Sequence, residues 1–449
     1  MIAGPEGLEV SGKGLLNTLP FDATFVQPFG PASKGQSSIV GEITLSDAAL
    51  RDLGVALPKG MIKGAGPGQI KVDLKSDQPA QLALTSNLQG VGLSLPALGW
   101  SKPAQKAGQL TLTALLGKVP EITSLNMDAA GLKASGTITL QPGGGLDSAR
   151  FDRVRLDDWL DAAVVLVGRG QGQAVGVSIA SGNVDLRRLA IQRGSSLGGE
   201  DGPLEVRLDR LTVSDGIALT QFRGSFSSKG GFNGSFTANV NGAAPVRGTV
   251  VPSAEGSAVR ITSDDAGRVM AAAGIFANAR GGSLDLQLLP TGAKGEYKGR
   301  AKIGTIRVQN ASVLAELLSA ISVVGVLEQL NGQGLVFNQA DVDFRLTPDA
   351  IEVTAGSAVG ASLGVSVAGI YETGSKALIM QGVVSPVYLL NGIGSFLARK
   401  GEGLFGFSYK IRGTADAPVI KVNPLSILTP GVVRKIFGKP APVLPKDNG

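Results

Sequence analysis

Histidine and cysteine are both absent from the 449 residues of this chain. Without cysteine there is no disulfide framework, no thiolate metal site and no cysteine nucleophile. Without histidine there is no Ser-His-Asp triad, no imidazole base near neutral pH and no ordinary zinc site. Carboxylate pairs, Ser-Lys arrangements and cations held by Asp and Glu remain as routes to chemistry. We therefore predict that the protein is not an enzyme and needs no cofactor.

Concentrated charge and long apolar runs are scarce as well. Aromatic residues make up 5% of the chain, and the net charge of +6 is spread thinly. A nucleic-acid binder usually shows a basic stripe interleaved with aromatics, so we predict no nucleic-acid partner. No apolar stretch approaches the ~20 residues that span a bilayer. Residues 1–6 lack the basic and apolar regions of a secretory signal. We expect an export signal and membrane anchor upstream, and interpret the chain as part of a longer protein or a split-gene product.

Glycine is abundant, with 65 residues, and hydrophobic residues reach 43%. Glycine in a helix interior costs about 1 kcal/mol relative to alanine, so this load disfavours long helices. It suits short strands joined by tight turns, because glycine adopts positive φ without steric cost. The hydrophobic content is also too high for a disordered linker. The composition predicts an ordered, mainly β protein.

Apolar and polar residues alternate through most of the chain, which is the pattern of a strand with one buried face. Antiparallel sheets with one wet face show this alternation, whereas buried parallel strands read as continuous apolar runs. Gly-rich turns such as Asn241-Gly242 separate the strands at short spacing. We predict an elongated, twisted antiparallel sheet. The clearest strands are residues 70–74, 204–208, 284–288, 342–346 and 405–411.

Helices are predicted to be few, short, amphipathic and concentrated after residue 260. Asp264 or Asp265 is expected to cap a helix that runs to about Phe276. Asn310 is expected to cap a helix from Ala311 to Leu330, because its apolar residues share one face. Residues 387–398 and 424–437 are two further helical candidates, and residues 439–449 are predicted to be a disordered tail.

Several motifs resemble catalytic or cofactor sites by their letters alone. Residues 7–13 have phosphate-loop spacing, but Gly14 stands where Ser or Thr should bind magnesium. Residues 401–406 fit a dinucleotide fingerprint, but they follow a predicted helix and open a strand. Residues 194–198 and 360–364 spell a nucleophile elbow without any histidine to act as base. We interpret all of them as turns or strands.

Paired acids leave an enzyme as a minor alternative. Asp341 and Asp343 share one face of a predicted strand, opposite Val342 and Phe344. That face is the solvent side of a half-wet sheet. We therefore interpret the two carboxylates as groups that keep the outer face wet.

From about residue 261, the chain resembles the AsmA-like C-terminal region of large envelope proteins of Gram-negative bacteria. The resemblance covers about 180 residues in consistent order. Residues 1–260 share with that region only a general pattern of amphipathic strands separated by glycines. The most specific motifs lie near the end of the chain. The segments that carry the resemblance are 263–267, 281–289, 297–299, 303–308, 331–337, 340–346, 384–386, 405–409, 416–418, 422–426 and 430–437.

The resemblance implies a long sheet curled into an open trough with an apolar inner face. It divides the chain into β-groove repeats over 1–260, the AsmA-like region over 261–438 and the tail. It also implies anchoring in the inner membrane, a periplasmic location and a role in phospholipid transport to the outer membrane. Phospholipid acyl chains are then the expected ligand, and envelope proteins of either membrane are possible partners. The candidate groove residues are Leu284, Leu286, Leu288, Val342, Phe344, Leu346, Phe405, Phe407, Tyr409 and Ile411.

Two other functions stay open on the sequence. The same architecture could assemble outer-membrane proteins, because an exposed strand edge can template a partner strand. A surface adhesin is the other alternative, although it would need short, nearly identical rungs, and the chain has no such strict repeat. Membrane contact is expected through the missing N-terminal anchor or through the C-terminal end. The identity of the lipid and the direction of transport are not encoded in any motif.

Overall fold

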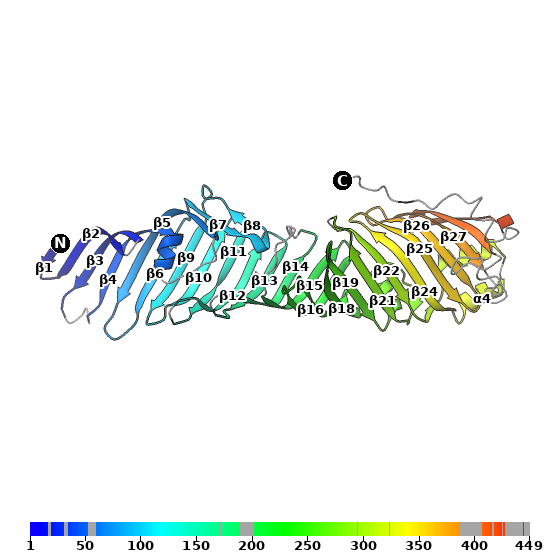
Figure 1. Cartoon of the computed structure of the whole chain (residues 1–449), viewed down its shortest axis with the longest axis horizontal. Helices are drawn as coiled ribbons and strands as arrows, with labels where there is room; N and C mark the ends of the chain where they lie inside the picture. Colours follow the sequence, from blue (N-terminus) through cyan, green and yellow to red (C-terminus); the bar gives the residue numbers. More distant parts are fainter. Residues whose placement is uncertain are drawn as a thin grey trace. The chain divides into compact units, whose positions relative to one another are not determined.

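The chain is mainly β and forms a twisted sheet that stays open, as the sequence predicted, but the sheet is mixed and not wholly antiparallel (Figure 1). The computed structural model describes residues 1–16, 19–30, 35–52, 60–142, 144–170, 173–188, 202–293, 295–322, 324–385, 406–414, 417–423, 425–426 and 443. Within these residues, neighbouring strands are mostly consecutive in the chain, as in a meander.

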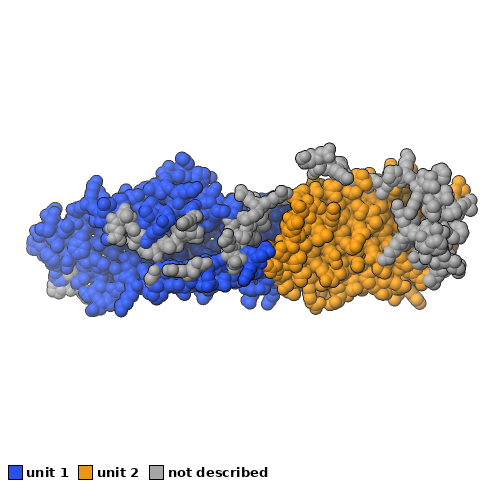
Figure 2. All heavy atoms as spheres, viewed as in Figure 1, with its two compact units in different colours: residues 1–212, 223–231 blue, residues 213–222, 232–449 orange. Residues whose placement is uncertain are grey.

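The chain divides into two compact units (Figure 2). Unit 1 comprises residues 1–212 and 223–231, and unit 2 comprises residues 213–222 and 232–449. The chain crosses the boundary near the end of strand β15 (Pro203–Ser214), within strand β16 (Ile217–Ser227) and again after residue 231. The division that the resemblance implies at residue 260 stays a prediction.

The described residues of unit 1 form short and medium strands, one helix and one 3-10 turn. Its elements are β1 (Ile2–Gly4), β2 (Gly7–Leu16), β3 (Leu19–Pro28), β4 (Ser37–Ser46), α1 (Asp47–Asp52), β5 (Ile62–Leu74), β6 (Ala80–Ser86), β7 (Val91–Leu95), η2 (Pro96–Leu98), β8 (Trp100–Lys102), β9 (Gln109–Leu116), β10 (Glu121–Ala129), β11 (Leu132–Leu140), β12 (Leu146–Leu156), β13 (Leu160–Val167), β14 (Gly176–Asp185) and β15 (Pro203–Ser214).

Unit 2 continues with strands and carries three helices among its described residues. Its elements are β17 (Asn233–Val240), β18 (Ala244–Ser253), β19 (Gly256–Ser263), α2 (Ala266–Ala272), β20 (Ala279–Arg280), β21 (Leu284–Pro290), β22 (Tyr297–Ile303), β23 (Ile306–Val308), α3 (Ser312–Ala320), α4 (Val324–Asn331), β24 (Leu335–Leu346), β25 (Ala350–Gly360), β26 (Gly364–Glu372), β27 (Ala377–Ser385), β28 (Phe407–Thr414) and β29 (Pro418–Asn423).

The hairpin between β17 and β18 shows how the local sequence sets the strand pairing. Asn241 and Gly242 have φ values of 46° and 77°. Two successive positive φ angles are typical of the tight turn whose twist matches that of the flanking strands. The amide of Ala243 donates to the carbonyl of Val240 and closes the turn at 3.0 Å. The turn residues that the sequence suggested therefore form a tight hairpin.

The prediction of a purely antiparallel sheet is wrong at one pair of strands. β14 and β15 run parallel, with Val177 opposite Leu204 and Ile179 opposite Val206. Parallel neighbours need a crossover of a dozen or more residues. Residues 186–202 provide that length between the two strands. The alternating pattern that suggested antiparallel pairing is compatible with either direction, so it did not reveal the crossover.

The helices differ from the prediction in detail. Asp265 caps α2 as expected, because its carboxylate accepts a 2.9 Å hydrogen bond from the amide of Arg268. The single helix predicted over residues 311–330 is instead the pair α3 and α4. Ser322, with a φ of 58°, lies in the left-handed region between them. The break lets both helices bury leucines in one cluster, which a straight helix would not allow.

Two further helix expectations also need correction. Asn310 is not the cap of α3, because α3 begins after Ala311 and has no side-chain cap. The backbone N–H of Asn310 donates instead to the carbonyl of Leu330. Helix α1 lies far upstream of residue 260, where no helix was predicted. The predicted helix at 387–398 lies outside the described residues. The one at 424–437 and the tail at 439–449 also do so, apart from residues 425, 426 and 443.

Candidate functional site: an apolar face in each unit

The strands of each unit separate apolar from polar side chains. In β11, Ile138 lies on one side of the sheet, and Thr137 and Thr139 lie on the other, because successive side chains point to opposite faces. Directly opposed residues of paired strands have their side chains on the same face. The strand register therefore shows which residues of neighbouring strands line up. We call the side that carries Ile138 the apolar face of unit 1.

In unit 1, apolar residues line up across every strand from β2 to β6 and from β9 to β15. No polar side chain interrupts this row. Most of its members are half-buried, so part of each side chain stays accessible. The row consists of Val10, Phe25, Ile39, Val72, Leu82, Ala114, Ile122, Ile138, Ala149, Leu166, Val177 and Leu204.

A second row runs beside the first on the same face and is likewise made of apolar residues and glycine. On each strand, its member lies two residues away from the member of the first row, except where a bulge shifts the register. The row consists of Gly12, Ala23, Gly41, Ile70, Leu84, Leu112, Leu125, Gly136, Phe151, Val164, Ile179 and Val206.

Unit 2 has an apolar face built in the same way. Its longest row crosses β17 to β19, β21, β22 and β24 to β29, and contains three of the candidate residues from the sequence. The row consists of Gly234, Val250, Val259, Leu288, Gly299, Phe344, Val353, Gly369, Met380, Ile411 and Ile420. A parallel row consists of Phe236, Gly248, Ile261, Leu286, Ala301, Val342, Gly356 and Val367.

The other candidate residues occupy the same face at different depths. Leu284 and Tyr409 are buried, at 8% and 4% exposure, in the cluster under helices α2 to α4. Phe407 packs against that cluster. Leu346 is half-buried opposite Tyr297. Phe405 lies outside the described residues.

Helices cover one part of the apolar face of unit 2. Residues of α2, α3 and α4 form a single cluster with the ends of β21, β24 and β28, in which Leu318 and Leu330 are fully buried. Leu286 and Ile411 touch this cluster, whereas Leu288, Val342 and Phe344 are half-buried and lie outside it. The apolar face is therefore sealed at one end of the strands and more accessible along the rest.

In unit 1, the cover is the ribbon β7–η2–β8. Trp100 is buried there, and its indole nitrogen donates to the carbonyl of Ala130 at 2.9 Å. Lys102 is also buried, and its ammonium group donates to the carbonyls of Leu88 and Val91 at 2.8 and 2.7 Å. Burial lowers the pKa of Lys102 below its ordinary value. These polar contacts hold the ribbon over the apolar clusters beneath it.

The opposite face of each unit is mainly polar and carries ion pairs between neighbouring strands, although it also exposes single apolar residues such as Val167 and Leu289. In unit 2, the guanidinium of Arg260 bonds both carboxylate oxygens of Asp285, at 2.9 and 2.8 Å, and Arg300 bonds Asp343 at 2.6 Å. The hydrogen bond from Arg260 lowers the pKa of Asp285, and the bond to Asp343 raises the pKa of Arg300. Asp343 is thus an ion-pair partner on the wet face.

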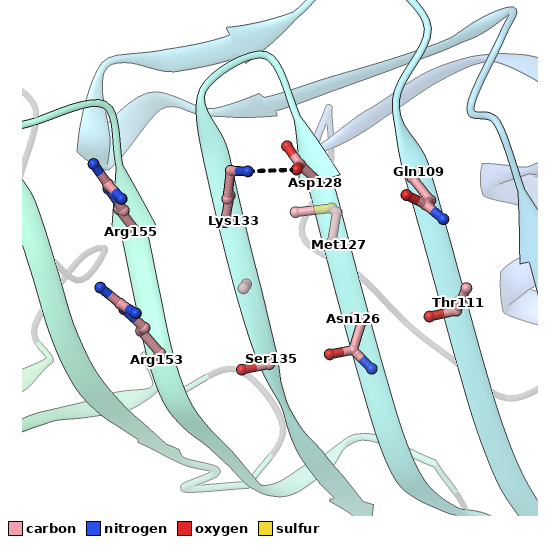
Figure 3. A pocket seen from close by; sticks show the side chains of 10 residues that line it. Gln109, Thr111, Asn126, Met127, Asp128, Lys133, Ser135, Arg153 and Arg155 are labelled. Carbon is pink, nitrogen blue, oxygen red and sulfur yellow. Dashed lines mark ion pairs between the residues drawn. The ribbon is translucent and has the colours of Figure 1, made fainter.

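Unit 1 has a shallow polar depression of about 320 Å³ on that face (Figure 3). Lys133 of β11 forms a 2.7 Å ion pair with Asp128 of β10, and Arg153 and Arg155 of β12 line the depression on the other side of β11. Arg153 bonds Asp161, which lowers the pKa of that carboxyl. The cationic groups are mostly matched by carboxylates, so the depression offers little uncompensated charge to a ligand.

Glycines of the apolar face mark places where neighbouring strands approach closely on that side. A Cβ atom on Gly41 would lie 2.6 Å from the Cα of Ala23, and one on Gly136 would lie 2.8 Å from the Cα of Phe151. Opposed Cβ atoms in an ordinary antiparallel pair are about 4.5–5.5 Å apart. Glycine within a strand often marks such a close approach or bend. At these two pairs, the missing side chain leaves room for the neighbouring strand to lie close on the apolar side.

The motifs that resembled catalytic sites are ordinary structure where they are described. Residues 7–13 lie within β2, paired with β3 along their length, and so form no phosphate loop. Residues 360–364 form the turn between β25 and β26, closed by a bond from the Gly360 amide to the Leu363 carbonyl. Residues 194–198 and 401–405 lie outside the described residues.

The part of the chain that the structure describes contains no cluster of three acidic side chains arranged to hold a metal ion. None of its helices has the length and apolar character needed to cross a bilayer. Comparisons with protein-family models, with curated proteins and with solved structures found no match. The apolar faces are therefore the feature from which function must be argued.

Sequence reasoning missed the rows of unit 1. The candidate residues predicted from the sequence all lie after residue 280, yet residues 1–212 carry rows that are longer than those of unit 2. The alternation of β11 and β15, visible at Ile138 and Leu204, was the available signal. The sequence could not show which strands lie beside each other, and the rows depend on that.

Proposed function

We propose that this chain is a lipid-binding scaffold of the AsmA-like kind, which carries phospholipid acyl chains along its apolar faces between the two membranes of a Gram-negative envelope. The single observation that carries the proposal is the pair of uninterrupted apolar rows in each unit, many of whose side chains stay half-buried. In a sealed core, such residues would be fully buried.

The dimensions of the rows suit hydrocarbon tails. Strands lie about 4.8 Å apart, so the first row of unit 1 extends on the order of 50 Å from β2 to β15. A tail in one leaflet occupies about half of the ~30 Å hydrocarbon core of a bilayer. Several tails could therefore lie end to end along one row. Each methylene group removed from water contributes about 0.8 kcal/mol, and a continuous apolar lining provides this without a tight pocket.

We propose that the apolar side is the concave, inner side of a groove. Gly41 and Gly136 support this, because their missing side chains leave room for neighbouring strands to lie close on that side. The opposite face keeps water-exposed ion pairs such as Arg260–Asp285. This division gives an inner surface for hydrocarbon and an outer surface for water.

Two adjacent leucines allow a matched test. Leu288 is half-buried in the apolar row, and Leu289, the next residue, is 54% exposed on the other face. Leu288→Asp places a charge among the expected lipid tails, whereas Leu289→Asp places the same charge in water beside Lys298. We expect the wild-type chain purified from a Gram-negative host to carry phospholipid in native mass spectrometry. Leu288→Asp should lose it, and Leu289→Asp should retain it.

Unit 1 offers the same pair in Leu166 and Val167, of which Val167 is 47% exposed. Leu166→Asp should reduce bound lipid, and Val167→Asp should not. Thermal unfolding followed by circular dichroism shows whether each variant stays folded. A wild-type chain free of phospholipid, or equal losses in both members of a pair, would contradict the proposal. Crosslinking to an outer-membrane barrel protein without lipid would favour the assembly role instead.

A further inference from the structure

We infer that Gly299 keeps the lipid path of unit 2 open by letting the ring of Phe344 lie flat on the sheet. This inference rests on the proposed function and assigns a specificity-determining role to a residue that contributes no side chain. Gly299 in β22 and Phe344 in β24 are direct cross-strand partners in the longest apolar row.

The geometry shows where the ring lies. A Cβ atom built on Gly299 would fall 2.1 Å from Cζ, 2.3 Å from Cε2 and 2.6 Å from Cε1 of Phe344. The outer half of the ring therefore occupies the volume that any other residue at position 299 would need. Gly299 is buried by this ring, and Phe344 itself is half-buried. One side of the ring faces the glycine and leaves the other available to a ligand.

The same construction occurs at two other cross-strand pairs. Phe236 covers Gly248, where an added Cβ atom would lie only 2.1 Å from the ring Cζ, and Phe21 covers Gly14 at 2.8 Å. Phe236 is also stacked on Phe222, with ring centroids 5.1 Å apart, so that it is buried. Two of these glycine–phenylalanine pairs lie in unit 2. Phe236 is buried and Phe344 is half-buried, so Phe344 is the ring that a lipid tail can reach.

A methyl group at position 299 would change the surface of the groove. Ordinary carbon contacts need about 3.5 Å, so the ring edge would have to move by more than about 1 Å, since it cannot pass through the backbone below. The available direction is away from the sheet, into the space where acyl tails are proposed to lie. A ring that stands up there narrows the path along the row. Covering a strand glycine with an aromatic ring also stabilises a sheet, so the test must separate stability from lipid binding.

The experiment compares the full-length chain with Gly299→Ala and with Gly299→Ala combined with Phe344→Leu. Leucine keeps the lining apolar but does not reach across to position 299. Each protein is incubated with vesicles of phosphatidylethanolamine and phosphatidylglycerol that contain a phospholipid with a photoactivatable acyl chain. Labelling of β21, β22 and β24 is then quantified by peptide mass spectrometry. Gly374→Ala is the control, because Gly374 lies in the turn between β26 and β27, outside the apolar rows, and a Cβ atom there would meet nothing within 4 Å.

We expect Gly299→Ala to reduce labelling of these strands by about fivefold, the scale of effect produced by overfilling a packed site with one methyl group. The double variant should regain most of the labelling, and Gly374→Ala should match the wild type. Unchanged labelling in Gly299→Ala would overturn the inference. Loss that the double variant does not restore would also overturn it, because the defect would then lie in folding. Absence of labelling in the wild type would instead contradict the proposed function.

Discussion

Substitution of Gly136 by alanine tests whether close strand approach on the apolar side is built into unit 1. A Cβ atom at this position would lie 2.1 Å from the carbonyl oxygen of Arg150 and 2.8 Å from the Cα of Phe151. Both are backbone atoms of β12, which cannot rotate out of the way as a side chain can. The φ of Gly136 is not positive, so the conflict is steric and not conformational. Strands β11 and β12 would have to separate by about 1 Å to restore ordinary contacts.

Overfilling a packed site in this way costs about 1–3 kcal/mol. With a denaturant slope of about 2 kcal/mol/M, the midpoint of urea unfolding of unit 1 should fall by about 0.5–1.5 M. Gly12 lies in the same row and on the same face, but a Cβ atom there meets nothing within 4 Å. Gly12→Ala should therefore leave the midpoint unchanged or raise it slightly, because alanine in a strand costs less entropy than glycine. Equal midpoints for Gly136→Ala and the wild type would refute the reasoning.

Three further predictions concern stability. Arg153 lowers the pKa of Asp161 below its ordinary 3.8, so the ion pair stabilises the folded state above that pH and this stabilisation is lost in more acidic solution. The midpoint of urea unfolding should therefore fall more between about pH 6 and pH 3 for the wild type than for Asp161→Asn. Burial lowers the pKa of Lys102, so just below pH 10.5 the unfolded chain binds more protons than the folded chain, and the free energy of unfolding should rise with pH there. Lys102→Met should abolish this rise, measured by urea unfolding. Trp100→Phe removes the bond to Ala130 and should cost about 1–2 kcal/mol in thermal unfolding, with no change if that bond is unimportant.

The sequence predicted the strands well where alternation was regular. Residues 284–288 and 342–346 lie in β21 and β24, with their apolar residues on one face, because period-2 patterning depends only on the local chain. The row that joins Leu288 to Phe344 could not be predicted. Its middle member is Gly299 of β22, and neither its pairing nor its role under the ring is visible in the residues themselves.

The errors have a common physical origin in tertiary structure. The apolar periodicity of residues 311–330 is continuous, yet the chain turns at Ser322, where there is neither proline nor glycine to signal a break. The gain is the burial of Leu318 and Leu330 in one cluster, which local propensity does not include. The parallel pairing of β14 with β15 likewise depends on the crossover between them and not on the pattern of either strand.

Residue-level mapping of photoactivatable phospholipid on the full-length chain tests the central claim most directly. The claim is that hydrocarbon tails contact one side of the sheet in each unit. Labels should appear at apolar-face residues such as Ile138, Leu166 and Leu288, and should be absent from Val167 and Leu289 on the opposite side. Labels distributed equally over both sides, or no labels at all, would contradict it.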